Sequence, residues 1–77
     1  MKVVFSDHAN LKIAQRKLSR KKILAIVARP DLTKLGHSSR EELFKRFGKN
    51  HLKVVIVRER DAIIVVTAHW VAIDPRK

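Results

Sequence analysis

The sequence predicts a single α+β domain, in which a short N-terminal strand and a two-helix hairpin are followed by a twisted antiparallel sheet of three or four strands. Two stretches in the first half carry apolar residues every three to four positions, which is the spacing of amphipathic helices. Two runs in the second half are rich in valine and isoleucine and flank a short polar segment, as in a β-hairpin. A chain of 77 residues is long enough for one such domain, spanning 1–77, and buries about 60–65% of the surface that its unfolded form exposes.

The first two elements are a strand and a helix that meet at a serine. Residues 2–5, KVVF, are rich in β-branched and aromatic side chains and are expected to form a short strand. Ser6 is the expected N-cap of a helix that begins at Asp7, whose carboxylate suits the positive end of the helix dipole. The apolar stripe of this helix consists of three residues: Ala9, Ile13 and Leu18.

A second helix is expected to begin after the N-cap Ser19 and to end before Pro30, because the residue before a proline avoids helical angles. Its apolar stripe consists of Ile23, Ile26 and Val27. The first turn holds three cations, each of which the helix dipole disfavours by about 0.3–1 kcal/mol. They are Arg20, Lys21 and Lys22. This break of a local rule indicates either a functional surface or exposed charges that the solvent screens.

The local pattern does not decide the secondary structure of the middle of the chain. Residues 31–41 contain Gly36 and two serines and are expected to form a loop. The segment REELFKRFG that follows fits a helix, with Ser38 and Glu41 spaced as a capping box and Gly48 as a C-terminal stop. The same segment also fits a strand, because its side chains alternate, and the local pattern leaves both open.

The C-terminal half predicts a tight antiparallel hairpin. LKVVIVRERDAIIVVTAHW, residues 52–70, contains two β-rich runs around RERD. Side chains of a regular strand alternate between its two faces. One face of the second strand is therefore expected to carry Ile63, Val65, Thr67 and His69. The other is expected to carry Ile64, Val66, Ala68 and Trp70. A central strand that turns polar at its end, as this one does, is a common place for a functional site.

The charge of the chain points to a polyanionic partner. Eighteen Lys and Arg against seven Asp and Glu give a net charge of +11. Between Asp7 and Asp31 there is no acid, although seven cations lie there: Lys12, Arg16, Lys17, Arg20, Lys21, Lys22 and Arg29. RNA or DNA is the first expectation, followed by an anionic membrane or an acidic protein. A basic surface without a dedicated partner also remains open.

Several function classes find no support in the sequence. There is no cysteine, so disulfides and thiolate metal sites are excluded, which fits a reducing cytoplasm. No segment has the length and apolar character of a signal peptide or a membrane span. The four histidines, at 8, 37, 51 and 69, lack the spacing of zinc ligands, and there is no glycine-rich phosphate loop. We expect a cytoplasmic protein without metal or cofactor and without a membrane partner.

Short motifs in a fixed order resemble a small family of bacterial and phage proteins of unknown function that is grouped with RelE- and BrnT-like toxins. They are FSDHA at 5–9, Lys12, Arg16, LKVV at 52–55 and VVTAHW at 65–70. The resemblance covers roughly residues 3–70. Lys12 stands where the family usually has arginine, which loses a planar bidentate fork, and His69 stands where it has tyrosine. The family also favours acids at 20–22.

The resemblance implies a RelE-like fold, related to the barnase, EndoU, colicin and RelE nucleases, and it resolves ELFKRF as a strand. It implies a toxin-like, metal-independent endoribonuclease that cleaves RNA by attack of the 2′-OH on phosphate and that an acidic antitoxin protein holds inactive. Such cleavage needs a base for the 2′-OH proton, an acid for the 5′-oxygen and cations around the phosphate. Histidine suits either proton role because its pKa lies near neutrality.

The candidate catalytic residues follow from this resemblance. His8, Lys12 and Arg16 fall at i, i+4 and i+8, on one face of the first helix. His8 is assigned a role as general base or acid, and Lys12 and Arg16 are assigned to the phosphate. Thr67 and His69 would approach from the last strand, with His69 as the complementary acid. The candidate nucleic-acid contacts are Lys17, Arg20, Lys21, Lys22, Arg46, Lys53 and Arg58. His37 and His51 are expected in loops and are given no role.

Each of these residues also has an ordinary structural interpretation. A histidine near a helix start often binds a backbone carbonyl or water, and Thr67 suits a strand by propensity alone. Three functions therefore remain open: the endoribonuclease, a non-catalytic RNA- or DNA-binding module on the same fold, and a protein-interaction module for an acidic partner. Low aromatic content argues against recognition of single strands by base stacking.

Overall fold

The structure is a computed structural model that describes residues 2–72 and 74–76 of the chain. Within these residues the chain forms two helices and a five-stranded sheet. The elements follow in the order β1 (Lys2–Phe5), α1 (Asp7–Arg16), α2 (Arg20–Ala28), β2 (Leu32–Leu35), β3 (Arg40–Phe47), β4 (Asn50–Arg58) and β5 (Ala62–Val71). The predicted α+β class is confirmed.

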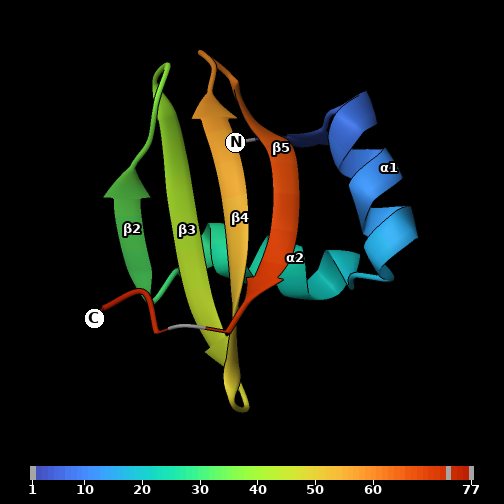
Figure 1. Cartoon of the computed structure of the whole chain (residues 1–77). Coiled ribbons are helices and arrows are strands. Elements are labelled where there is room, and N and C mark those ends of the chain that lie inside the picture. Colours follow the sequence, from blue (N-terminus) through green and yellow to red (C-terminus); the bar gives the residue numbers. More distant parts are fainter. Residues whose placement is uncertain (1, 73, 77) are drawn as a thin grey trace.

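The strands lie side by side in the order β1-β5-β4-β3-β2 (Figure 1). Strands β2 to β5 form an antiparallel meander, whereas β1 pairs in parallel with β5, so that Lys2 lies opposite Ala62. The prediction gave an antiparallel sheet of three or four strands after the helices. The sheet is instead mixed and has five strands within the described residues, because the first strand of the chain joins its edge.

Strand β2 lies inside the segment 31–41 that was predicted to be a loop. It pairs with β3, with Leu32 opposite Phe44, and its side chains are mostly exposed, Leu35 by 89%. An edge strand without a buried face shows no hydrophobic alternation, so no local pattern in the sequence indicates it. The turn into β3 uses Ser38 and Ser39 at φ 57° and 61°, the positive values typical of two-residue hairpin turns.

Segment 40–47 forms strand β3, so the strand interpretation of ELFKRF is confirmed. Leu43 is 1% exposed and belongs to the hydrophobic core, and the adjacent Phe44 is 5% exposed on the opposite face of the sheet. A strand between two paired neighbours buries both faces, which an exposed helix at this position would not do.

Both helices begin at the predicted serine caps. The Ser6 hydroxyl accepts a hydrogen bond from Ala9 N–H at 3.0 Å, and the Ser19 hydroxyl accepts one from Lys22 N–H at 3.2 Å. Helix α1 ends at Lys17, which adopts the left-handed conformation at φ 53°. Local capping chemistry therefore fixes where the two helices begin. Neither helix is long and apolar enough to cross a membrane.

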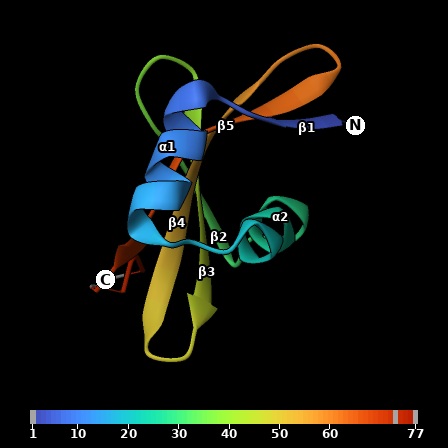
Figure 2. The same cartoon turned by 90° about the vertical axis from the view of Figure 1, so that its right-hand side faces the viewer.

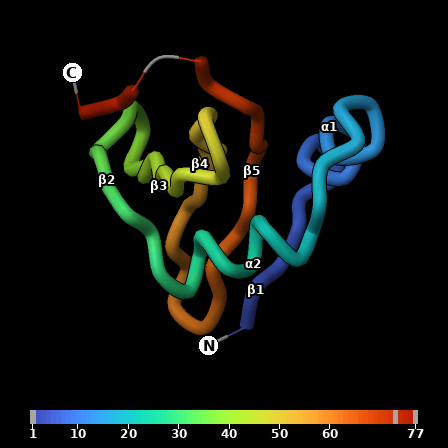
Figure 3. Tube along the Cα trace, turned by 90° about the horizontal axis from the view of Figure 1, so that it is seen from below, coloured from blue at the N-terminus to red at the C-terminus, as the bar shows by residue number. Residues whose placement is uncertain are grey.

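The two helices have different positions relative to the sheet. Helix α2 lies across one face and contacts β3 and β4, whereas α1 lies alongside β5 at the edge (Figures 2 and 3). The hydrophobic core fills the space between the helices and the sheet and includes Ala9, Ile13, Leu18, Ile23, Ile26, Leu43, Leu52, Val54, Ile56, Ile63, Val65 and Ala68. Among the described residues neither helix covers the opposite face, which we call the open face.

A β-bulge changes the face to which the end of β5 points. Val55 pairs with Thr67 and the next residue of β4, Ile56, pairs with Val65, so β5 contains one extra residue. Val65 and Ala68 are both fully buried in the core although two residues separate them. The predicted common face of Val65 with Thr67 and His69 is therefore wrong. The bulge restarts the alternation, and Thr67 and His69 lie on the open face.

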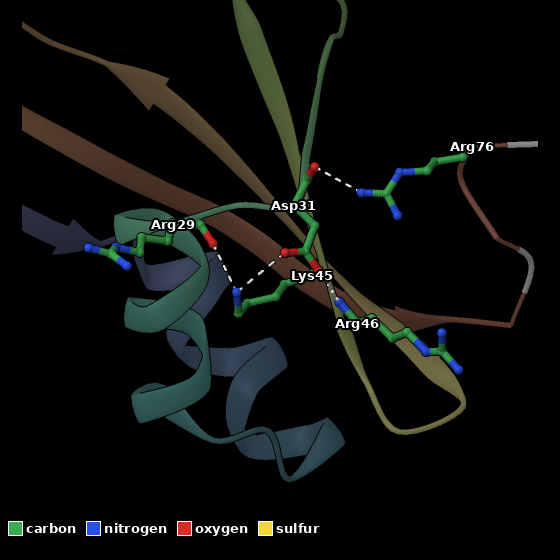
Figure 4. Close-up of polar contacts among 5 residues, drawn as sticks. All are labelled: Arg29, Asp31, Lys45, Arg46 and Arg76. Atoms are coloured by element: carbon green, nitrogen blue, oxygen red, sulfur yellow. Dashed lines mark hydrogen bonds and ion pairs between the residues drawn. The ribbon is translucent and has the colours of Figure 1, made fainter.

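Asp31 joins α2, β3 and the C-terminal segment (Figure 4). Its carboxylate accepts hydrogen bonds from Arg46 N–H at 3.0 Å and from the Lys45 ammonium at 3.4 Å, and its carbonyl accepts one from the Arg76 guanidinium at 3.0 Å. Lys45 also donates to the Arg29 carbonyl at 3.2 Å. The hydrogen bond from Arg46, helped by the charge of Lys45, holds the pKa of Asp31 below its ordinary value. This junction ties residues 74–76 to the start of β2.

Candidate nucleic-acid interface on the open face

The open face carries a group of polar residues around one aromatic side chain, contributed by four neighbouring strands. Cross-strand pairing places Phe44, Lys53 and His69 in one row across β3, β4 and β5. The next row begins with Lys34 on β2 opposite Glu42 on β3, and ends with Thr67 on β5. Directly opposite residues of a sheet have Cβ atoms about 4.5–5.5 Å apart. We call these six residues the open-face cluster: Lys34, Glu42, Phe44, Lys53, Thr67 and His69.

Two lysines of the cluster are held by neighbouring side chains. The Lys53 ammonium lies 3.4 Å from the Glu42 carboxylate and 6.0 Å from the centre of the Phe44 ring. The Lys34 ammonium lies 5.7 Å from the centre of the same ring. Cation–π attraction and one ion pair therefore keep both ammonium groups over Phe44 rather than extended into solvent.

Arg16 brings a further cation to the edge of β5. The backbone pairing of β1 with β5 stops at Val65, which leaves the outer edge of β5 without a strand beyond that point. The Arg16 guanidinium donates a hydrogen bond to the Ala68 carbonyl at 2.8 Å, and the Ser6 hydroxyl donates one to the Val66 carbonyl at 3.3 Å. Helix α1 thus satisfies an otherwise open strand edge. The guanidinium has five N–H donors, so this bond leaves others for a ligand.

The electrostatic surroundings of His69 favour its neutral form. Partial burial lowers the pKa of His69 below 6.5, and the positive charges of Lys53 and Arg16 lower it further, against the opposing effect of Glu42. His69 is therefore predominantly neutral at pH 7 and can accept a proton. A neutral imidazole with cations on the neighbouring strand and the neighbouring helix has the properties of a general base next to a phosphate site.

Within the described residues, no hydrogen bond, ion pair or ring contact joins the other two predicted residues of α1 to this cluster. His8 is exposed, and its imidazole makes no hydrogen bond or ion pair with the residues that the structure describes. The Lys12 ammonium donates to the Gln15 side chain at 3.4 Å. Both share the helix with Arg16, but of the three predicted residues of α1, Arg16 is the one in contact with β5. Lys17 is exposed at the end of the helix.

The cations at the start of α2 pack against aromatic rings. The Arg20 guanidinium carbon lies 4.9 Å from the centre of the Phe5 ring, and Arg20 also donates to the Asn10 side chain at 2.8 Å. The Lys22 ammonium lies 5.2 Å and 5.6 Å from the centres of the Phe47 and Trp70 rings. For Arg20 and Lys22 these contacts offset the unfavourable dipole, whereas Lys21 is exposed to the solvent. Because α2 covers the other face, the structure separates Arg20, Lys21 and Lys22 from the open-face cluster.

Of the three predicted cations on the strands, two lie on the open face and one lies away from the cluster. Lys53 belongs to the open-face cluster. Arg46 also lies on the open face, one row further along, where its guanidinium donates to the Gly48 carbonyl at 2.8 Å. Arg58 forms an ion pair with Glu41 at 2.6 Å near the opposite end of β4, so its charge is already matched.

A hollow of about 460 Å³ adjoins the cluster where the C-terminal segment crosses the open face. It is lined by Lys34, Phe44, Lys53, Trp70, Val71, Ala72, Asp74 and Pro75. The combination of apolar walls and two ammonium groups is typical of sites for small ligands that carry both an apolar and an anionic part. Among the described residues no group of three or more histidine and acidic side chains could hold a metal ion.

Sequence reasoning missed three members of the cluster: Lys34, Glu42 and Phe44. The segment of Lys34 was expected to be a loop, and the local pattern of the segment that holds Glu42 and Phe44 fitted a helix as well as a strand. The relation of all three residues to His69 depends on pairing across four strands. Short-range sequence patterns do not indicate which strands pair with one another. The expected loop position of His51 is also wrong, because His51 lies in β4 and is 6% exposed.

No known family model matches the chain, and searches of curated proteins and of solved structures gave no match.

Proposed function

We propose that the protein is a toxin-like endoribonuclease that binds RNA on the open face and cleaves it without a metal ion. The observation that carries this proposal is the position of His69 on the open face, with Lys53 opposite it on β4 and with the Arg16 guanidinium bound to the carbonyl of Ala68. Partial burial and the charges of these two cations lower the pKa of His69 and favour its neutral form. The arrangement of β1, the helix pair and the antiparallel strands supports a RelE-like fold as part of the same proposal.

The proposed reaction is an attack of the ribose 2′-oxygen on the adjacent phosphorus. His69 takes the proton of the 2′-OH, the 2′-oxygen forms a bond to phosphorus, and the bond from phosphorus to the 5′-oxygen breaks. Lys53 and Arg16 stabilise the negative charge that gathers on the phosphoryl oxygens. His8 on α1 is the candidate acid that gives a proton to the departing 5′-oxygen. The products are a 2′,3′-cyclic phosphate and a 5′-hydroxyl end.

This assignment reverses the role first expected for His69. The family resemblance led us to expect His69 as the acid, but a lowered pKa favours the unprotonated form, which suits a base. The Thr67 hydroxyl lies in the adjacent row and can hydrogen-bond a phosphoryl oxygen. Lys34 and Phe44 would hold the nucleotide next to the scissile phosphate, in the hollow described above.

The test is cleavage of a mixed-sequence RNA in EDTA by the wild-type protein and three histidine variants. His69→Ala should reduce the cleavage rate by about 10²–10⁴-fold, the usual loss for a general base. His8→Ala should also reduce it, whereas His37→Ala, in the exposed turn after β2, should leave it unchanged. Equal rates for wild type and His69→Ala, with both proteins folded by circular dichroism, would overturn the proposed mechanism.

The second candidate function is a non-catalytic RNA-binding module. The observation that favours it is that, within the described residues, no hydrogen bond or ion pair links His8, the proposed acid, to the open-face cluster. This function predicts intact RNA in every lane and equal binding by wild type and His69→Ala.

An acidic protein partner belongs to the same proposal. A net charge of +11 favours an acidic antitoxin that covers the open face and competes with RNA. A cytoplasmic location, where RNA is present, is also part of this proposal.

A further inference from the structure

A second hollow lies on the other side of the C-terminal segment and is lined largely by cations. It has a volume of about 200 Å³, and its walls are formed by Arg46, Lys49, His51, Ala72, Asp74 and Arg76. Three of these side chains are cationic and one is a carboxylate, so the hollow carries an excess of positive charge. The Asp74 carboxylate accepts a hydrogen bond from Arg76 N–H at 2.9 Å and so stabilises the turn that forms one wall.

His51 in this hollow contains a buried polar atom without a partner. The residue is 6% exposed, and its Nε2 atom has no hydrogen bond to any residue that the structure describes. Buried side-chain nitrogens in folded proteins nearly always have a hydrogen-bond partner. Because His51 lines the hollow, a ligand bound there would supply the missing partner.

The arginines of this hollow are held in place before any ligand binds. Arg46 lies directly across from His51 on β3, and its Nε donates to the Gly48 carbonyl at 2.8 Å. Arg76 donates to the Asp31 carbonyl at 3.0 Å (Figure 4). Each guanidinium uses one of its five N–H donors in this way and keeps others free for a ligand. Fixed guanidinium groups bind phosphate well because their donors match its oxygens in pairs.

We propose that this hollow binds a phosphate group through Arg46, Lys49, His51 and Arg76. The source of the phosphate is argued from its position and rests on the proposed function. His51 lies two residues before Lys53 on the same face of β4, a separation of about 6.8 Å along the strand. Successive phosphates of a single nucleic-acid strand are separated by a similar distance. The hollow is thus placed to take the phosphate next to the one at His69. A free phosphate or a phosphate monoester presents the same chemistry.

The direct test is a titration of the protein with inorganic phosphate, followed through the NMR signals of the His51 imidazole, with chloride at equal ionic strength as reference. Phosphate should shift the His51 signals, and chloride should not. Arg46→Gln and Arg76→Gln should each weaken binding by roughly tenfold or more. Arg60→Gln is the matched control, because Arg60 is an exposed arginine in the turn at the opposite end of β4. Arg46 and Arg76 are exposed, so replacing either of them leaves the buried His51 intact.

A second arm identifies the source of the phosphate. A 2′-O-methyl RNA oligonucleotide has no 2′-OH nucleophile and cannot be cleaved by the proposed reaction. If it shifts the signals of both His51 and His69, and Arg46→Gln weakens its binding, the phosphate comes from the RNA strand. If inorganic phosphate shifts His51 and the oligonucleotide does not, the hollow takes a free phosphate or a monoester.

The inference is overturned if phosphate leaves the His51 signals unchanged, or if Arg60→Gln weakens binding as much as Arg46→Gln does. Either result leaves the RNA-cleavage assay with His69→Ala unaffected. Conversely, an inactive wild-type protein whose His51 still responds to phosphate would remove the proposed function and keep this binding site.

Discussion

Arg16 combines a structural and an electrostatic task in one side chain. Its hydrogen bond to the Ala68 carbonyl completes the edge of β5 where β1 has ended. Its charge also lowers the pKa of His69, after the larger effect of burial and that of Lys53. A substitution at this position therefore changes the strand edge and the titration of His69 together. Arg16→Lys would keep the positive charge that lowers the pKa of His69, but it would lose most of the N–H donors of the guanidinium.

The titration of His69 should respond to each neighbouring charge with a defined sign. In the wild-type protein the NMR midpoint should lie below 6.5, because burial and two cations disfavour the protonated form. Arg16→Gln and Lys53→Gln should each move the midpoint up, toward 6.5. Glu42→Gln should move it further down, because the Glu42 carboxylate stabilises the imidazolium. A midpoint that moves in the same direction in all three variants would contradict this account.

The same shift sets the pH dependence of cleavage and of stability. Cleavage should rise with pH through a midpoint below 6.5, since the base must be unprotonated. The pKa of His69 is lower in the folded than in the unfolded chain, so the unfolded chain binds more protons in this range. The contribution of His69 to stability is therefore complete above about pH 6.5 and is lost as the pH falls through the folded value.

At the scale of the elements, the bulge in β5 decides which side chains reach the open face. Between Val65 and Ala68, both in the core, two residues stand where a regular strand would have one or three. Deleting Val66 should give a regular strand that keeps Val65 and Ala68 on the core side. Deleting Ile64 should instead move every later side chain to the opposite face.

These two deletions form a matched pair of equal length and similar chemistry. We expect the protein without Val66 to unfold cooperatively in urea and the protein without Ile64 to lose the native fold. Both outcomes can be followed by circular dichroism and by the emission of Trp70, which lies in a T-shaped contact with Phe47 at 6.1 Å. Equal stability of the two deletions would show that alternation on β5 does not control the fold.

The helices could be predicted closely because their signals are local. The start of each helix follows from its serine cap, Ser6 or Ser19, and from the apolar spacing after it, all of which lie within a few residues of one another. Strand β2 could not be predicted, because it is an exposed edge strand that is held by backbone pairing to β3. The bulge also lies beyond a local pattern, since it is defined by the register of β5 against β4.

The candidate site could be predicted in part for the same reason. Thr67 and His69 stood out as polar residues at the end of an apolar strand, and they do lie together on one face. Of the three residues predicted to join them from the first helix, Arg16 lies next to them, because its long side chain donates to the Ala68 carbonyl between the two. Lys34 and Glu42 come from strands whose pairing the sequence does not report.

At the scale of the whole molecule, two groups of cations have different surroundings. One group lies on the open face around the cluster and the second hollow, whereas on the other side of the sheet Arg20 and Lys22 of α2 pack over aromatic rings. Net charge alone would make both groups equal in nucleic-acid binding. The structure predicts that they are not equal.

We expect binding of a 2′-O-methyl RNA oligonucleotide to weaken steeply with salt, because each neutralised phosphate releases counterions. Lys53→Gln should weaken binding and reduce the slope of log K against log[salt] by about 0.7, the value for one phosphate contact with a single strand. Lys21→Gln is the matched control, since Lys21 is exposed on α2. Fluorescence anisotropy at several salt concentrations measures both. An equal loss in the two variants would indicate binding by overall charge.

The parallel pairing of β1 with β5 also has a consequence for how the protein is made. Contacts between these strands join residues that are 60 positions apart, as in the hydrogen bond from Ser6 to Val66. Pairings between residues so far apart in the sequence slow folding, because the chain between them loses entropy when its ends are brought together. During synthesis β1 and α1 leave the ribosome long before β5 exists, and the edge that Arg16 covers is absent until Ala68 has emerged. Both the fold and the surroundings of His69 are therefore completed after translation of nearly all the described residues, so the nascent chain carries its positive charge well before it has its site.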